Sequence, residues 1–283
     1  MRLAWCSGLL LAVVAASSVR ADEWSQRYSV EGVPSVHVRT NDGNVRVEPG
    51  EDARVDARVT TVGWRIAPDA VTISQRQDGG RIEIEVRLPK QVFSISSGRS
   101  LEIALRVPAR ADLELRSGDG NIVVRGVSGR LGLSSGDGNI TAEDLHGELR
   151  LHTGDGSIRG SGLSGRLRAD TGDGGVNVRG RFEGLELHTG DGGIEATAEA
   201  GSKIEAAWSL RTGDGGITLR LPEDLGAELD AETGDGRIVL DRPVTVTGTI
   251  ERASVRGTLG SGGAPLRLRT GDGSIRLTGL AAP

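Results

Sequence analysis

Cysteine and aromatic residues are nearly absent from this sequence. It has one cysteine, Cys6, and aromatic side chains make up 2% of its 283 residues. Cys6 lies in an apolar stretch near the start, so a chain cleaved after that stretch has no disulfide, no thiol chemistry and no cysteine ligand for a metal. A core with so few large rings must be narrow and filled by valine, isoleucine, leucine and alanine.

Long apolar runs are missing after the first 21 residues. Basic Arg2, the apolar run Leu3–Ala16 and the small-residue site Val19-Arg20-Ala21 are together typical of a cleaved secretory signal peptide. The run is short for a membrane anchor, which needs about 20 residues. We therefore expect residues 1–21 to be removed, and the mature protein to have no membrane span and to be exported to the periplasm or the cell surface.

Positive charge is also scarce. Removal of Arg2 and Arg20 leaves 32 basic residues against 39 acidic ones, which gives the mature protein a net charge of −7. Nucleic acids and anionic membrane surfaces attract basic proteins. The charge balance therefore argues against either of them as the main partner.

What the sequence has in abundance is glycine, much of it in a repeated Gly-Asp-Gly tripeptide. The repeat is x-L-x-L-x-[ST]-G-D-G-x-I, and its first five aspartates are 18 residues apart: Asp119, Asp137, Asp155, Asp173 and Asp191. Three further copies follow at wider spacing, with Asp214, Asp235 and Asp272. A period near twenty residues is typical of a repeat architecture in which each unit contacts only its neighbours.

Alternating apolar and polar residues fill the chain before the repeats. This alternation predicts half-buried β-strands over Ser35–Thr40, Asn44–Pro49, Ala53–Thr60, Val71–Gln77, Arg81–Leu88 and Leu101–Val107. Between the first two, Asp42-Gly43-Asn44-Val45 looks like a degenerate copy of the later repeat. We expect three parts: a signal peptide over 1–21, a less regular β part over 22–110 and a regular repeat part over 111–283.

Two all-β architectures fit the repeat. In a parallel β-solenoid each 18-residue unit is one coil, and equivalent positions stack about 4.8 Å apart. In an antiparallel β-meander each Gly-Asp-Gly is a hairpin turn. Equivalent positions of four successive units alternate in sign, namely Asp112, Arg130, Glu148 and Arg166. Because such charges attract one another only as direct neighbours, the column favours the solenoid and leaves the meander as the alternative.

The order of the motifs resembles a bacterial "putative adhesin" family of exported β-strand-repeat proteins of unknown function. The resemblance rests on VHVRTNDGNVRVEPG near the start, the TGDGxI units, Leu221–Ile238 and the closing segment Leu259–Leu277, and it spans Tyr28 to Leu280. It implies a right-handed β-solenoid in the cell envelope and brings no catalytic residues. This chain has Gly-Asp-Gly where many relatives have Gly-Ser-Gly-Asp, which leaves the role of the aspartates open.

The repeated aspartates have a structural and a functional interpretation. Structurally, Gly-Asp-Gly is a tight turn in which glycine supplies a positive φ and aspartate caps backbone N–H groups. Functionally, stacked carboxylates attract Ca²⁺. The calcium β-roll, however, has two glycine-rich turns in each 18-residue coil, whereas this repeat has one. We therefore predict turns and no metal site.

Histidines do not predict a metal site either. His152 and His188 share a repeat position two units apart, which is about 9.6 Å by stacking and too far to share one zinc ion. His37 and His146 lie elsewhere in the sequence. We expect all four to be exposed strand residues.

Catalytic motifs are missing from the sequence, which has no nucleophile elbow, HExxH or Walker loop. The short units leave no room for the long loops that carry the active sites of polysaccharide-cleaving β-helices, so a pocket could lie only near Trp64 or over Thr197–Trp208. We predict no catalytic or cofactor-binding residues and no cofactor.

The leading hypothesis is a non-catalytic envelope protein, adhesin-like or a scaffold, with a protein or glycan partner. A calcium-stabilised surface repeat protein and a carbohydrate-active β-helix enzyme are the alternatives.

Overall fold

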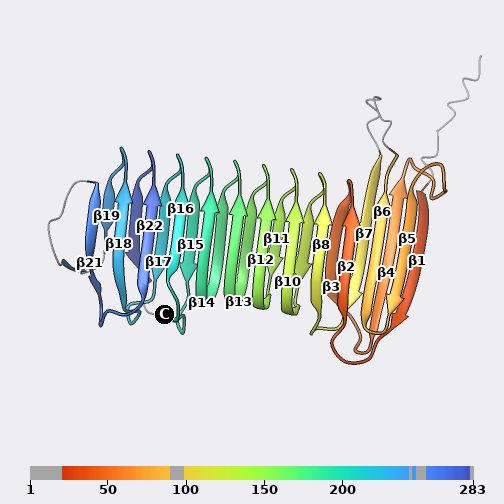
Figure 1. Ribbon diagram of the computed structural model, residues 1–283, viewed down its shortest axis with the longest axis horizontal. Coiled ribbons are helices and arrows are strands. Elements are labelled where there is room, and N and C mark those ends of the chain that lie inside the picture. Colours follow the sequence, from red (N-terminus) through yellow and green to blue (C-terminus); the bar gives the residue numbers. More distant parts are fainter. Residues whose placement is uncertain (1–20, 90–98, 242–243, 247–252, 281–283) are drawn as a thin grey trace, which may run out of the picture.

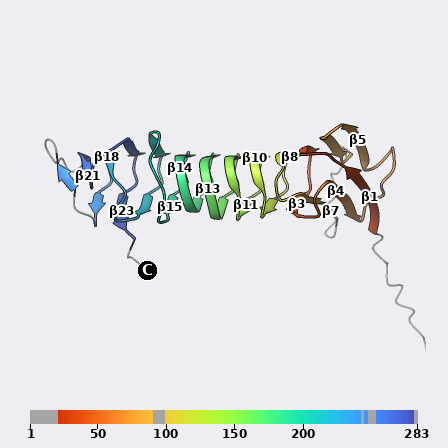
Figure 2. The ribbon, with the colours of Figure 1, turned by 90° about the horizontal axis from the view of Figure 1, so that it is seen from below.

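The computed structural model describes residues 21–89, 99–241, 244–246 and 253–280. The predicted signal peptide, apart from Ala21, lies outside these residues. Within the described ranges the structure is all-β, and no helix is long and apolar enough to cross a membrane. The strands form one mixed, mostly parallel sheet that folds back on itself into an elongated, two-faced stack (Figures 1 and 2).

Each repeat contributes one strand before its Gly-Asp-Gly turn and one after it. We call the two layers face A and face B. In spatial order, face A consists of β5 (Thr72–Asp78), β6 (Arg81–Arg87), β2 (Ser35–Thr40), β8 (Asp112–Ser117), β10 (Ser128–Ser135), β12 (His146–Thr153), the second halves of β13 (Ile158–Thr171) and β14 (Val176–Thr189), β16 (Trp208–Thr212), β22 (Pro265–Thr270), β18 (Ala227–Thr233), β21 (Ser254–Leu259) and β20 (Val244–Val246).

Face B lies across the core from face A. It consists of β1 (Ala21–Ser29), β4 (Arg54–Val62), β7 (Ser100–Val107), β3 (Asn44–Pro49), β9 (Ile122–Arg125), β11 (Ile140–Glu143), the first halves of β13 and β14, β15 (Ile194–Ala198), β17 (Ile217–Leu221), β23 (Ile275–Gly279) and β19 (Ile238–Leu240). Because β13 and β14 run from face B into face A, the two faces form one continuous sheet.

Neighbouring repeats pair in parallel with an offset of one unit. Leu131 of β10 is paired with Leu113 of β8 on one side and with Leu149 of β12 on the other. The parallel stacking of 18-residue units predicted from the sequence is therefore confirmed. The strands joined by each described Gly-Asp-Gly turn lie on different faces, so the hairpins of the antiparallel alternative are absent from these repeats.

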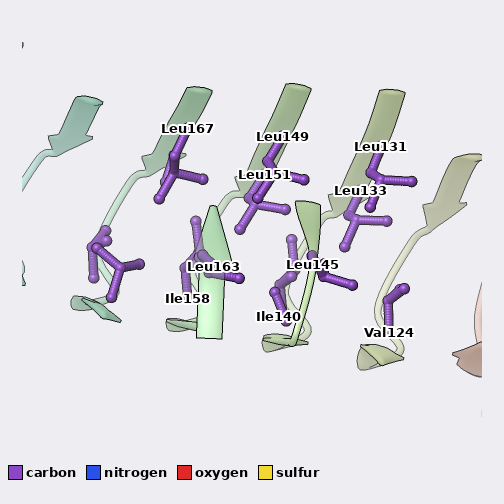
Figure 3. Packing of buried hydrophobic residues seen from close by; sticks show 14 of the residues in the cluster. Val124, Leu131, Leu133, Ile140, Leu145, Leu149, Leu151, Ile158, Leu163 and Leu167 are labelled. Atoms are coloured by element: carbon purple, nitrogen blue, oxygen red, sulfur yellow. The ribbon is translucent and has the colours of Figure 1, made fainter. Parts of the chain in front are cut away.

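A narrow aliphatic core fills the space between the faces. Leu131 and Leu133 of face A, Ile140 of face B and Leu145 of the bend between them lie in this layer (Figure 3), and each is at most 2% exposed. Burying one such side chain stabilises the fold by about 1.5–3 kcal/mol. Since every unit contributes equivalent residues, the core runs along the whole stack.

The spatial order of the units departs from the sequence order at both ends. The degenerate first copy, β2–β3, lies directly beside β8–β9. The last copy, β22–β23, is inserted between β16–β17 and β18–β19. Antiparallel pairs close the ends, with β1–β4 and β5–β6 at one end and β20–β21 at the other (Figure 1).

Five of the six strands predicted before the repeats begin and end within one residue of the observed strands β2, β3, β5, β6 and β7, and β4 extends two residues further. The sequence did not predict β1. Ala21–Ser29 lacks regular alternation because, as an edge strand paired only with β4, it covers little of the core.

Candidate functional site

The Gly-Asp-Gly turns align along one long edge of the stack, which we call the turn edge (Figure 1). Each unit places one exposed aspartate there, in the spatial order Asp42, Asp119, Asp137, Asp155, Asp173, Asp191, Asp214, Asp272 and Asp235. Within the described ranges these carboxylates form no hydrogen bond and no ion pair. Nor does any group of three His, Asp or Glu in the described chain lie close enough to hold a metal ion. The turn edge is a row of solvated negative charges.

The capping role predicted for the aspartates belongs to the preceding hydroxyl residue. Thr189 is 0% exposed, and its Oγ1 accepts a hydrogen bond from Gly192 N at 3.2 Å and donates one to Gly174 O of the neighbouring unit at 2.8 Å. Equivalent donations to the neighbouring unit come from Ser117, Ser135, Thr153, Thr171, Thr212, Thr270 and Thr233. The predicted aspartate cap is therefore wrong, because the carboxylate faces solvent while the hydroxyl is buried.

The glycines of these turns are required by close backbone contact. From Gly118 onward none of them has a positive φ, so the conformational role predicted for them is also wrong; only Gly43 of the degenerate copy has one, at 115°. A Cβ on Gly138 would lie 2.1 Å from Gly120 O of the next unit. Any side chain there would push the stacked turns apart.

The charged column that favoured parallel stacking is present, but only part of it is paired. Arg130 Nη2 lies 2.5 Å from Asp112 Oδ2, and this hydrogen-bonded pair lowers the pKa of Asp112. Glu148 instead pairs with Arg150 of its own strand. Arg166 forms no ion pair or hydrogen bond through its side chain with any described residue.

A similar pair links neighbouring units on face B. Arg125 Nε donates to Glu143 Oε2 at 2.7 Å, and this bond lowers the pKa of Glu143. Such ion pairs fix side chains on the flat outer surfaces without burying them.

All four histidines lie on strands, as predicted, but only His146, His152 and His188 are exposed, whereas His37 is half-buried. His152 and His188 occupy one outward column of face A with Asp170 between them. The sequence analysis missed this aspartate. Asp170 Oδ2 accepts a hydrogen bond from Arg168 Nε at 2.9 Å, which ties it to its own strand. His146 Nδ1 lies 2.6 Å from Ser164 Oγ of the next unit.

The edge opposite the turns, where the chain returns from face B to face A, is called the return edge. A groove of about 650 Å³ lies on it, bordered by β12, β13, β14 and Gly201 of the loop between β15 and β16. This loop projects at the lower edge of the stack (Figure 1) and falls in Thr197–Trp208, one of the two stretches where the sequence left room for a pocket. Near Trp64, the other stretch, the Arg99 guanidinium lies 4.5 Å from the ring centroid.

Comparison with protein families identifies the chain. Its residues 33–278 match the family described as Toastrack DUF4097. The chain belongs to this family. The resemblance drawn from the repeats and the closing segment is thereby confirmed, and the DUF4097 match includes both the degenerate first copy and the inserted last one. No curated protein matches the chain.

Solved structures similar to this DUF4097 protein are remote in sequence. A "putative adhesin" from Bacteroides fragilis has 10% identity and a TM-score of 0.39, with 92% of this chain and 97% of that chain covered. A "putative cell adhesion protein" from Clostridium sporogenes has 12% identity and a TM-score of 0.33, with 92% and 100% covered. A "putative lipid binding protein" from Parabacteroides distasonis has 13% identity and a TM-score of 0.37, with 92% and 97% covered. Structural similarity with TM-scores below 0.5 does not indicate the function of this chain.

Proposed function

We propose that this DUF4097 protein is a non-catalytic, exported protein of the cell envelope that binds its partner through long polar faces, as an adhesin or a scaffold does. Its rigid element is a right-handed parallel β-solenoid. The observation that carries the proposal is the composition of the surface. Val33, at 48%, is the one large apolar side chain exposed among the described residues, whereas the outward strand positions are mostly charged or polar.

A surface of this kind suits a polar partner. Large exposed apolar patches mark permanent protein interfaces and membrane contacts. The outer faces instead hold ion pairs between neighbouring units, such as Arg125–Glu143. Glycans and the polar rims of protein interfaces are recognised by charged and hydrogen-bonding side chains held in place in this way. Export is supported by the signal-like residues 1–21.

The non-catalytic part of the proposal agrees with the structural causes of three shifted pKa values, those of Asp112, Glu143 and Tyr28. The pKa values of Asp112 and Glu143 are lowered by their arginine partners, and burial raises the pKa of Tyr28 to about 12. Structural ion pairs and burial account for these shifts without catalysis. None of the three groups lines the groove on the return edge.

Fractionation of the producing bacterium, followed by a cell-binding assay, tests the proposal. We expect the protein in the envelope fraction with a chain beginning at Asp22, and we expect purified mature protein to bind saturably to cells of a deletion strain. Cytoplasmic protein that retains Met1, or an absence of saturable binding to the cells, would contradict the proposal.

A further inference from the structure

The groove on the return edge lies where the repeat is locally irregular. The pairing of β13 with β14 shifts register between Gly160 and Leu163 and again, in the opposite sense, between Gly165 and Arg166. The second shift leaves Glu183 as an extra residue in β14 and places Phe182 opposite Gly165. The two shifts cancel, so the 18-residue count is kept. Bulges of this kind re-aim side chains and are common beside binding sites.

The sequence contains a signal for these bulges. The step from Val176 to Phe182 is one residue longer than the equivalent step from Ile158 to Leu163, and the step that follows is one residue shorter. Phe182 is 1% exposed, while Arg181 and Glu183 on either side of it are exposed. Arg181 and Glu183 therefore point outward at the groove, on either side of the buried Phe182.

The loop after β15 is fixed to the backbone of Phe182 on both sides. Ser202 Oγ accepts a hydrogen bond from Phe182 N at 3.1 Å, and Lys203 N donates to Phe182 O at 2.9 Å. Ser202 Oγ also donates to Glu199 O at 2.7 Å, which closes the turn of the loop. The wall formed by Gly201 is thus held in position before any ligand arrives, which lowers the entropic cost of binding.

Two arginines in the groove have no partner in the described chain. Arg166 and Arg181 form no side-chain hydrogen bond or ion pair there. Arg150 and Arg168, by contrast, bind carboxylates on the same face. Arg181 is paired in register with Ser164, which lies two residues before Arg166 on the adjacent strand, and both arginines line the groove.

The geometry points to the carboxylate of an acidic oligosaccharide as the group that these arginines bind. We propose that the groove binds a sugar chain bearing a uronic acid, which deepens the proposed binding function and rests on it. Guanidinium groups bind carboxylates through two parallel hydrogen bonds. Glu183, whose carboxylate is also unpaired in the described chain, would accept hydrogen bonds from sugar hydroxyl groups. A groove of about 650 Å³ has the volume of a small-ligand site.

The charge of the whole molecule restricts the ligand further. The mature net charge of −7 and the aspartate row of the turn edge repel long polyanions. A saccharide with isolated carboxylates among neutral sugars meets less repulsion than a nucleic acid or a polyphosphate does.

Calorimetry with purified mature protein tests this proposal. The probes are xylotriose carrying one glucuronic, galacturonic or mannuronic acid, and xylotriose itself as the neutral control. We expect at least one acidic probe to bind ten-fold or more tightly than xylotriose. Arg166→Ala with Arg181→Ala should remove that difference, and the two lysine replacements should restore part of it, because they keep the charge and lose the planar fork.

The matched control is Arg159→Ala, which removes an exposed, unpaired arginine of face B outside the groove and should leave binding unchanged. Trp208 provides a second signal, since its ring meets Phe182 edge-on with centroids 6.3 Å apart, and its fluorescence should change on binding. The melting temperatures of all variants should match that of the wild type, which would exclude misfolding as the cause of lost binding.

No binding of any acidic probe, equal binding of xylotriose, or an equal loss in the Arg159 variant would overturn the proposal. If the probes fail while envelope location and cell binding hold, only the sugar proposal falls. A cytoplasmic protein would instead overturn the proposed function, whatever the probes do.

Discussion

At the scale of the residue, the buried hydroxyl before each turn joins two units. Thr189 satisfies a backbone N–H of its own turn and a carbonyl of the next one while fully excluded from water. This column of hydroxyls explains why the repeat has Ser or Thr at that position, which hydrophobic periodicity alone does not indicate.

Replacing Thr189 by valine keeps the shape of the side chain and removes both hydrogen bonds. We expect a loss of about 1–3 kcal/mol in the free energy of unfolding, because a part-buried N–H and a buried carbonyl lose their partner. Thr189→Ser keeps the hydroxyl and should cost clearly less. Urea unfolding measures both variants, and an equal loss for serine and valine would argue against the hydrogen bonds as the cause.

The aspartates of the turn edge should contribute little to stability. Neighbouring carboxylates about 4.8 Å apart repel each other by about 0.9 kcal/mol in water before salt screening. We therefore expect the triple variant Asp137→Asn, Asp155→Asn, Asp173→Asn to melt at the wild-type temperature, or slightly higher at low salt. Millimolar Ca²⁺ should shift neither melting temperature. A calcium-dependent rise of several degrees that is lost in the variant would favour the calcium alternative by mass action.

At the scale of the element, ion pairs between neighbouring strands make stability depend on pH. Arg130 lowers the pKa of Asp112, so the pair stabilises the fold above the unfolded pKa of about 3.9 and loses this effect as pH falls through the lower folded value. Asp112→Asn should lower the melting temperature at pH 7, and the difference should disappear once the pH falls below the lowered pKa of Asp112. A constant difference from pH 2 to pH 7 would contradict this assignment.

The insertion of the last repeat can be tested with cysteines, because the one native cysteine, Cys6, lies in none of the repeats. Ser209 is paired with Arg267, and Arg267 is paired with Asp230 on its other side. Cα atoms of neighbouring strands lie about 4.8 Å apart, within the range of a disulfide, while those two strands apart lie at about 9.6 Å. The pair Ser209→Cys and Arg267→Cys should form a disulfide, and the control pair Ser209→Cys and Asp230→Cys should not. Cross-linking of the control pair alone would indicate that the units stack in sequence order.

At the scale of the whole molecule, the stack is a rod. Face A has thirteen described strands side by side. At about 4.8 Å each they span about 60 Å along the stack. Small-angle scattering of the mature protein should give the distance distribution of an elongated particle, and the distribution of a compact sphere would rule out this architecture.

Most of what the sequence alone determined about the fold follows from its local periodicity. Alternating residues place β2 and β3 correctly, and the 18-residue spacing predicts parallel stacking because each unit repeats the same apolar positions. The apolar columns through Leu131 and Ile140 follow from the same count. The family could also be recognised from the order of these motifs.

Only the tertiary structure decided how the units are ordered and which residues meet. Asp235 and Asp272 are 37 residues apart in the sequence, yet their units are adjacent, because the strands of the last repeat pair with two earlier ones. Thr189 and Gly138 are required at their positions because the backbones of neighbouring units lie close together. This close contact cannot be read from the pattern of residues along the sequence. The groove likewise exists only because a bulge in β14 and the loop after β15 converge in space on Phe182.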